Sequence, residues 1–128
     1  MIRTARCACG TCTLEAEGEP LLNAICNCDN CKQRTGSAFG WSAYFPDEAV
    51  TVRGDLRRYE LPHRQTDRFF CAACGTTLYW RSTSFMPGHT GVAGGCFTDN
   101  PLGPPNVTAT DANRCAWITL PEGWLAAP

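Results

Sequence analysis

The chain has 128 residues, which is enough for one domain and too short for two comparable hydrophobic cores. With 44% hydrophobic and 18% charged residues it is globular in composition, and a formal net charge of -1 argues against a nucleic-acid or membrane-surface partner. No apolar run approaches the length of a signal peptide or a membrane-spanning helix, so we expect a cytoplasmic protein.

Short β-like segments separated by Gly, Pro, Asn and Asp dominate the chain, and no long segment has helical periodicity. The pattern predicts a mostly β fold, in which Gly54 and Asp55 form the turn of a hairpin between two successive strands. Helical turns are expected only near residues 29–35 and 46–49. In chain order, the predicted strands are 13–17, 21–25, 39–45, 49–53, 56–61, 68–70, 77–81, 91–93 and 115–120.

Two later segments are predicted to be irregular. Residues 100–110 contain three prolines and are expected to form a loop. Residues 121–128 are expected to be a C-terminal tail on a single domain that spans residues 1–120. A β core this small gains from bound metal, because ligation supplies folding energy that the buried apolar area lacks.

Ten cysteines are the most unusual feature of the composition, and seven of them fall into three short-spaced clusters. Cysteines one or two residues apart suit a single metal ion, whereas they make strained disulfide partners. We therefore favour metal binding, with a disulfide framework as the alternative. The clusters are Cys7-Ala8-Cys9, Cys26-Asn27-Cys28-Asp29-Asn30-Cys31 and Cys71-Ala72-Ala73-Cys74-Gly75.

The first and last clusters together would complete a four-sulfur zinc site with a structural role, because a full tetrahedral site has no position left for substrate. Its ligands would be Cys7, Cys9, Cys71 and Cys74. The middle cluster then offers three ligands to a second zinc and leaves a fourth position for water or substrate. Those ligands would be Cys26, Cys28 and Cys31.

The charge of the second site predicts its chemistry. Three thiolates on Zn²⁺ give a net charge of about -1, so the ion is a weaker Lewis acid than one held by three histidines. Such a site is better suited to keeping an incoming thiolate deprotonated for attack on an electrophile than to activating water. The sequence thus favours thiol chemistry over hydrolysis.

An alternative is a second structural zinc whose fourth ligand is Cys12, Cys96 or Cys115. These three cysteines otherwise have the character of small buried hydrophobic residues on strand-like segments. His63 and His89 are isolated and are expected at the surface. The aromatic residues are expected in the core; they include Trp41, Tyr44, Phe45, Phe69, Phe70, Tyr79 and Trp80.

The order of the three motifs, CxC, CxCxxC and CxxCG, resembles the glutathione-dependent formaldehyde-activating enzyme (GFA/CENP-V) family, and the likeness runs over nearly the whole chain. The matching segments are Cys7-Ala8-Cys9-Gly10, Cys26-Asn27-Cys28-Asp29-Asn30-Cys31 with Thr35-Gly36-Ser37, Phe70-Cys71-Ala72-Ala73-Cys74-Gly75-Thr76, and Gly95-Cys96-Phe97-Thr98-Asp99.

The resemblance implies a β-tent fold of short antiparallel sheets with two zinc ions per chain. It also implies that the ion at Cys26, Cys28 and Cys31 is the catalytic one and that the four-cysteine ion is structural. The family activity is carbon–sulfur bond chemistry, in which glutathione adds to formaldehyde to give S-hydroxymethylglutathione.

The enzyme hypothesis is therefore a zinc-dependent carbon–sulfur lyase or synthase with a small thiol substrate. Gln33, Arg34, Thr35 and Gly36 follow the second cluster directly and are candidates to line the thiol pocket. Arg34 could pair with a glutathione carboxylate, and Thr35 could protonate the alkoxide. The alternatives are a non-catalytic zinc-binding β-tent module that grips a partner, or a methionine sulfoxide reductase with a nucleophilic cysteine outside the zinc sites, such as Cys96 or Cys115.

Overall fold

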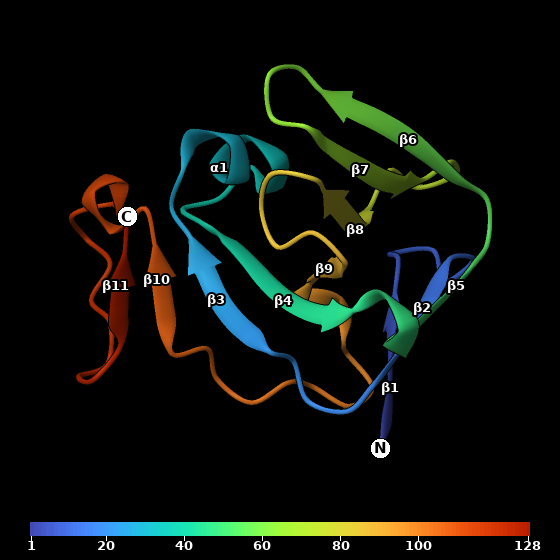
Figure 1. The fold of residues 1–128 in the computed structure, drawn as a ribbon, viewed down its shortest axis with the longest axis horizontal. Helices are drawn as coiled ribbons and strands as arrows, with labels where there is room; N and C mark the ends of the chain where they lie inside the picture. The colour runs from blue at the N-terminus through green and yellow to red at the C-terminus, as the bar shows by residue number, and fades with distance from the viewer.

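Two β-sheets make up most of the computed structural model, which describes residues 1–128 (Figure 1). The smaller sheet has the strand order β1-β2-β5, and the larger has the order β11-β10-β3-β4-β9-β8-β7-β6. The strands are β1 (Ile2–Arg6), β2 (Thr13–Glu17), β3 (Leu22–Cys26), β4 (Gly40–Pro46), β5 (Val50–Arg53), β6 (Leu56–Leu61), β7 (Thr66–Cys71), β8 (Thr77–Ser82), β9 (His89–Ala93), β10 (Val107–Ala109) and β11 (Leu125–Ala127). The prediction of a mostly β fold is confirmed.

One α-helix, α1 (Asp29–Thr35), follows β3 directly. Its first turn is capped by Cys28, whose Sγ accepts a hydrogen bond from the backbone N–H of Cys31, and it ends at Gly36, which has a left-handed φ of 62°. The remaining helical turns are 3₁₀ segments: η1 (Asp47–Ala49), η2 (Gly94–Cys96) and η3 (Asp111–Asn113). Both predicted helical regions are confirmed, and no helix is long and apolar enough to cross a membrane.

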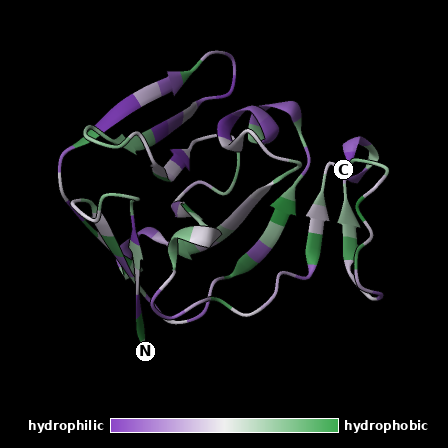
Figure 2. Cartoon of the chain, turned by 180° about the vertical axis from the view of Figure 1, so that it is seen from behind, coloured by the Kyte–Doolittle hydropathy of each residue, from purple (hydrophilic) through white to green (hydrophobic).

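The hydrophobic core lies between the two sheets. Leu14 and Ala16 alternate inward from β2, and Ala43 and Phe45 do the same from β4. The outer hairpin of β6 and β7 is mostly hydrophilic, whereas β3 near the centre is largely hydrophobic (Figure 2). This packing brings the turn between β1 and β2 against the turn between β7 and β8.

The predicted hairpin between residues 49–53 and 56–61 is wrong. Strand β5 pairs with β2 in the small sheet, while β6 pairs with β7 in the large one. The chain crosses between sheets at Gly54, which has a φ of 112°, and a β-carbon there would lie 2.8 Å from the Sγ of Cys12. The glycine therefore serves close packing between sheets and not a hairpin turn.

The C-terminal region also differs from expectation. Residues 115–120 form no strand, whereas the predicted loop 100–110 contains β10 and the predicted tail 121–128 contains β11. Strand β10 runs parallel to β3 and to β11, and the buried side chain of Asn27 donates hydrogen bonds to Thr108 Oγ1 and to the Ala109 carbonyl. These three-residue strands are defined by long-range pairing, as is β1, which the sequence did not indicate.

Candidate functional site

Two turns that are far apart in sequence bring four cysteines together. Cys7 and Cys9 lie between β1 and β2, Cys71 ends β7 and Cys74 lies in the turn that leads to β8, and all four Sγ atoms are within 4.8 Å of one another. The Sγ–Sγ distances are 3.6 Å from Cys7 to Cys9 and 3.8 Å from Cys9 to Cys71. A tetrahedral zinc with bonds of about 2.3 Å requires sulfur–sulfur edges of about 3.8 Å. The four sulfurs therefore fit one zinc ion and leave no position open.

Hydrogen bonds around this four-cysteine cluster favour the thiolate form that a metal needs. The backbone N–H of Cys74, and next the hydroxyl of Thr11, lower the pKa of Cys71 to about 5. The hydroxyl of Thr76 lowers the pKa of Cys74 to about 7. Hydrogen bonding thus favours the thiolate form at Cys71 and Cys74, whereas the hydrogen bonds of Cys9 to Thr11 are outweighed by burial and by the thiols of Cys7 and Cys74, so that its pKa is raised.

The second group of cysteines surrounds the start of α1. Cys26 ends β3, Cys28 caps the helix and Cys31 lies in its first turn, with their Sγ atoms within 4.8 Å of one another. A hydrogen bond from the Cys31 thiol lowers the pKa of Cys26 to about 5, and the same bond raises the pKa of Cys31. The two sulfur atoms are thus close enough for the ionisation of one to oppose that of the other, which is the spacing that two ligands of one metal ion need.

No fourth ligand completes this three-cysteine cluster, which contains no further Cys, His, Asp or Glu. Cys12 is fully buried beside the first cluster, where burial raises the pKa of its thiol to about 11. Cys96 lies in η2 and Cys115 in an irregular segment, both half-buried. All ten cysteines are free thiols, so the disulfide framework is not found.

A cavity of about 300 Å³ opens onto the three-cysteine cluster. Its floor is one face of β3 and β4, because Ala24 pairs with Ser42 and Leu22 pairs with Tyr44, and residues two apart on a strand share a face. Cys26 continues the same face at the end of β3, opposite Gly40. The sheet register thus places the cluster at one end of the cavity and a tyrosine farther along it.

Three arginines and no Asp or Glu line this cavity; they are Arg34, Arg64 and Arg68. The guanidinium carbon of Arg34 lies 4.4 Å from the centroid of the Trp80 ring, and its Nη2 is buried without a hydrogen-bond partner. Arg68 donates to the side-chain oxygen of Asn30 at 3.0 Å, and burial together with the nearby Arg34 lowers its pKa. Unpaired positive charge facing a cavity indicates an anionic ligand.

Two aromatic residues that the sequence indicated as core also line the cavity. The hydroxyl of Tyr44 accepts a hydrogen bond from Trp80 Nε1 at 3.0 Å, and the two rings meet edge to face. Burial raises the pKa of Tyr44 to about 12, so its hydroxyl is protonated at neutral pH. The alternation along β4 was the available signal for Tyr44, but it does not distinguish a cavity face from a core face.

Of the four residues expected to line the thiol pocket, Arg34 does so. Gln33 is exposed, and Gly36 ends the helix. The Thr35 hydroxyl lies 3.1 Å from both the Cys31 and the Phe39 carbonyl oxygens, so it is engaged with the end of α1. These three lie outside the cavity lining.

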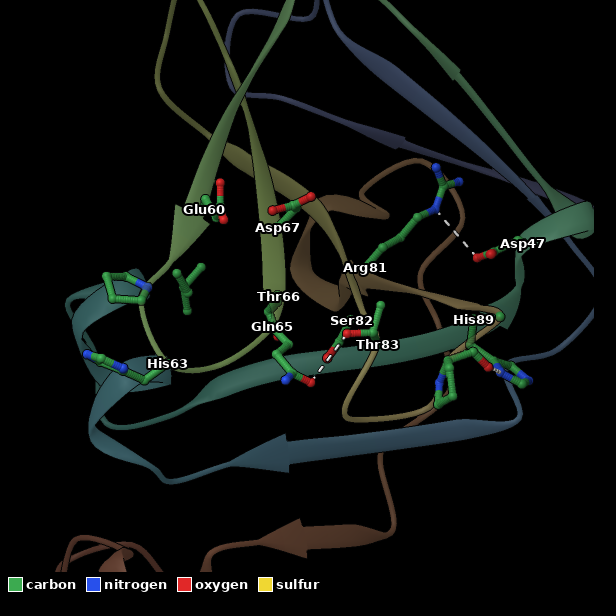
Figure 3. Close-up of a pocket in the computed structure, with 14 residues that line it drawn as sticks. Asp47, Glu60, His63, Gln65, Thr66, Asp67, Arg81, Ser82, Thr83 and His89 are labelled. Carbon is green, nitrogen blue, oxygen red and sulfur yellow. Dashed lines mark hydrogen bonds and ion pairs between the residues drawn. The ribbon is translucent and has the colours of Figure 1, made fainter.

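A second hollow of about 800 Å³ lies beside the β6–β7 turn (Figure 3). Its lining is polar and includes His63, His89 and the ion pair of Arg81 with Asp47, whose atoms are 3.5 Å apart. No cysteine lines it. Of these two cavities the smaller is therefore the candidate site, because it combines potential metal-ligating sulfur with unpaired cationic side chains.

The fold and the clusters define a small β protein with one closed four-sulfur site and one three-sulfur site facing a cationic cavity. The family model described as glutathione-dependent formaldehyde-activating enzyme matches residues 2–112, and the chain belongs to this family. The structure is also similar to the crystal structure of a Rhodobacter sphaeroides protein from structural genomics, with a TM-score of 0.62 and 24% identity, covering 74% of this chain and 87% of that one. That likeness supports the fold.

Proposed function

We propose that this protein catalyses the addition of an anionic thiol, with glutathione the first candidate, to a small aldehyde such as formaldehyde. The observation that carries the proposal is the cavity lined by three cysteines and three arginines, with no Asp or Glu side chain. Family membership supports the same chemistry. The four-cysteine cluster has the structural role, since its sulfur spacing leaves no position for substrate.

Zinc held by Cys26, Cys28 and Cys31 would supply a fourth coordination position where a thiol loses its proton. The protein's own residues orient that thiol. The positive charges of Arg34 and Arg68 attract the carboxylates of the thiol, and Trp80 packs against Arg34, whose guanidinium carbon lies 4.4 Å from the centroid of the indole ring. The sulfur then faces the aldehyde at the cysteine end of the cavity.

The reaction forms a sulfur–carbon bond and an O–H bond, and it breaks the S–H bond of the thiol and the π bond of the carbonyl. The thiolate sulfur attacks the carbonyl carbon, the carbonyl π electrons move to oxygen, and the oxygen takes a proton to give a hydroxymethyl thioether. The proton lost by the thiol balances the one gained by oxygen. Binding the thiol and the aldehyde at the same end of the cavity also accelerates the reaction, because the reacting atoms are held close together.

The test is exchange NMR of glutathione and formaldehyde with zinc-loaded protein. We expect exchange faster than the uncatalysed reaction, with the acceleration lost in Cys28→Ser and kept in Cys115→Ser, which alters a cysteine outside both clusters. Thiol binding without acceleration would refute the enzyme and favour the partner-binding module instead.

A further inference from the structure

One hydroxyl group in the cavity is held by a donor that occupies its oxygen and leaves its proton free. Tyr44 Oη accepts from Trp80 Nε1 at 3.0 Å, so its own O–H has to find an acceptor elsewhere. The Tyr44 ring is fixed by edge-to-face contacts with Trp80 at 6.4 Å and with Phe85 at 5.4 Å between centroids. The hydroxyl is thus positioned by its surroundings before any ligand enters.

A glycine in the sheet leaves room for the contact between Tyr44 and Trp80. Tyr44 on β4 and Trp80 on β8 are not on neighbouring strands; both lie opposite Gly91 of the intervening strand β9. A β-carbon at position 91 would overlap the indole of Trp80 at Nε1. The absence of a side chain at Gly91 therefore lets the indole cross β9 and reach the tyrosine hydroxyl.

The other hydroxyl groups of the cavity are less suited to donate a proton. Ser82 Oγ lies 3.0 Å from Ser84 Oγ, which is an acceptor within reach of its proton, and Thr66 donates to the Arg64 carbonyl. The hydroxyl of Thr110 lies close enough to the Cys26 sulfur to lower the pKa of that thiol.

Ser42 remains, and it lies between Gly40 and Tyr44 on the same face of β4. An aliphatic alcohol is a much weaker acid than a phenol, so Ser42 is less suited than Tyr44 to donate a proton. Substitution of Ser42 is therefore the control for substitution of Tyr44.

We propose that Tyr44 is the general acid that protonates the aldehyde oxygen. This inference rests on the proposed thiol–aldehyde addition. As the sulfur–carbon bond forms and the carbonyl π pair moves to oxygen, the Tyr44 O–H bond breaks and its proton passes to that oxygen. The phenolate is stabilised by the Trp80 N–H and by the positive charge of Arg34, and it regains a proton from solvent, which received the proton of the thiol.

The experiment compares wild type, Tyr44→Phe and Ser42→Ala, all loaded with zinc. Tyr44→Phe removes only the hydroxyl, so we expect glutathione affinity by calorimetry to stay within about 2-fold while the catalysed exchange rate falls about 100-fold or more. Affinity for the hydroxymethyl adduct, titrated in excess formaldehyde, should fall about 5-fold. Ser42→Ala should match wild type in all three measurements.

Trp80→Phe provides a second variant, since it keeps an aromatic ring but removes the donor to Tyr44. We expect an intermediate loss of rate, about 10-fold, and a smaller loss of glutathione affinity, because the phenyl ring still faces Arg34. Tyr44→Phe turning over as fast as wild type would overturn the inference while leaving the proposed function intact, and equal loss of thiol binding and rate would assign Tyr44 a structural role. A wild-type protein that binds glutathione without accelerating the exchange would refute the proposed function itself and this inference with it.

Discussion

The Nη2 atom of Arg34 occupies the space that a side chain at Gly40 would fill, because a β-carbon there would lie 2.5 Å from it. The guanidinium is thus confined between the backbone of β4 and the face of Trp80. Gly40 also lies opposite Cys26 in the pairing of β3 with β4, so this position without a side chain is next to the three-cysteine cluster. This contact gives a way to move the arginine without altering its charge.

Gly40→Ala should therefore displace Arg34 and weaken binding of an anionic thiol. We expect the dissociation constant for glutathione to rise about 10-fold, because the positive charge that attracts its carboxylate is displaced, while a neutral thiol such as 2-mercaptoethanol binds as before. Calorimetric titration measures both. Gly95→Ala is the control, since a β-carbon there meets nothing within 4 Å. An equal loss for both thiols would show that the substitution damages the cysteine cluster itself.

Cys71→Ser should prevent stable folding. Structural zinc contributes on the order of 10 kcal/mol in small domains, which is comparable to the whole free energy of unfolding expected for a chain of this size. We expect an insoluble or non-cooperatively melting protein by circular dichroism. Cys115→Ser, at a half-buried thiol outside both clusters, should melt like wild type. A soluble Cys71→Ser protein with a cooperative unfolding transition would show that the four-cysteine site is not required for folding.

Cys28→Ser should keep the fold and lose one metal ion. The three-cysteine cluster has fewer protein ligands and lies at a cavity, so its ion is held more weakly than the enclosed one. Elemental analysis should give about two zinc ions per wild-type chain and about one in the variant. Mild chelation of wild type should likewise remove about one ion per chain without unfolding. Simultaneous release of both ions with loss of structure would show that the two sites are not distinct.

Thiol affinity should rise with pH. The thiolate is the ligand and its formation releases a proton, so the apparent dissociation constant should fall about 10-fold per pH unit below the thiol pKa of about 8.5 and then level off. Tyr44 does not contribute to this slope, because burial raises its pKa to about 12 and it stays protonated throughout. Titrations from pH 6 to pH 9 at about one-unit intervals measure it. A dissociation constant independent of pH would mean that the thiol binds without losing its proton.

The two cysteine clusters could be predicted from the sequence because the spacing of chelating residues is largely local. Cys26, Cys28 and Cys31 act from one strand end and one helix turn, so their spacing is visible along the chain. Cys7 and Cys71 are far apart in sequence and come from different sheets. The number of cysteines in each motif nevertheless indicated that the first and third motifs form one four-sulfur site.

The other residues that line the cavity could not be predicted from spacing along the sequence. Arg68, Trp80 and Tyr44 come from three strands of one sheet, and their meeting depends on strand order and register. A tyrosine in an apolar alternation looks the same whether it faces a core or a cavity. The strands β10 and β11 were missed for a related reason, since three residues carry too little periodicity and parallel pairing leaves no turn between neighbours.

The central claim is that Cys26, Cys28 and Cys31 hold a zinc ion that accepts an external thiol, and zinc X-ray absorption tests it most directly. Seven cysteine ligands shared by two ions average about 3.5 sulfurs per zinc, and one added thiolate raises the average to about 4. We expect that increase when glutathione is added to protein loaded with two zinc ions, and no increase in Cys28→Ser. An average of 4 before any thiol is added, or one that saturating glutathione leaves unchanged, would contradict the account.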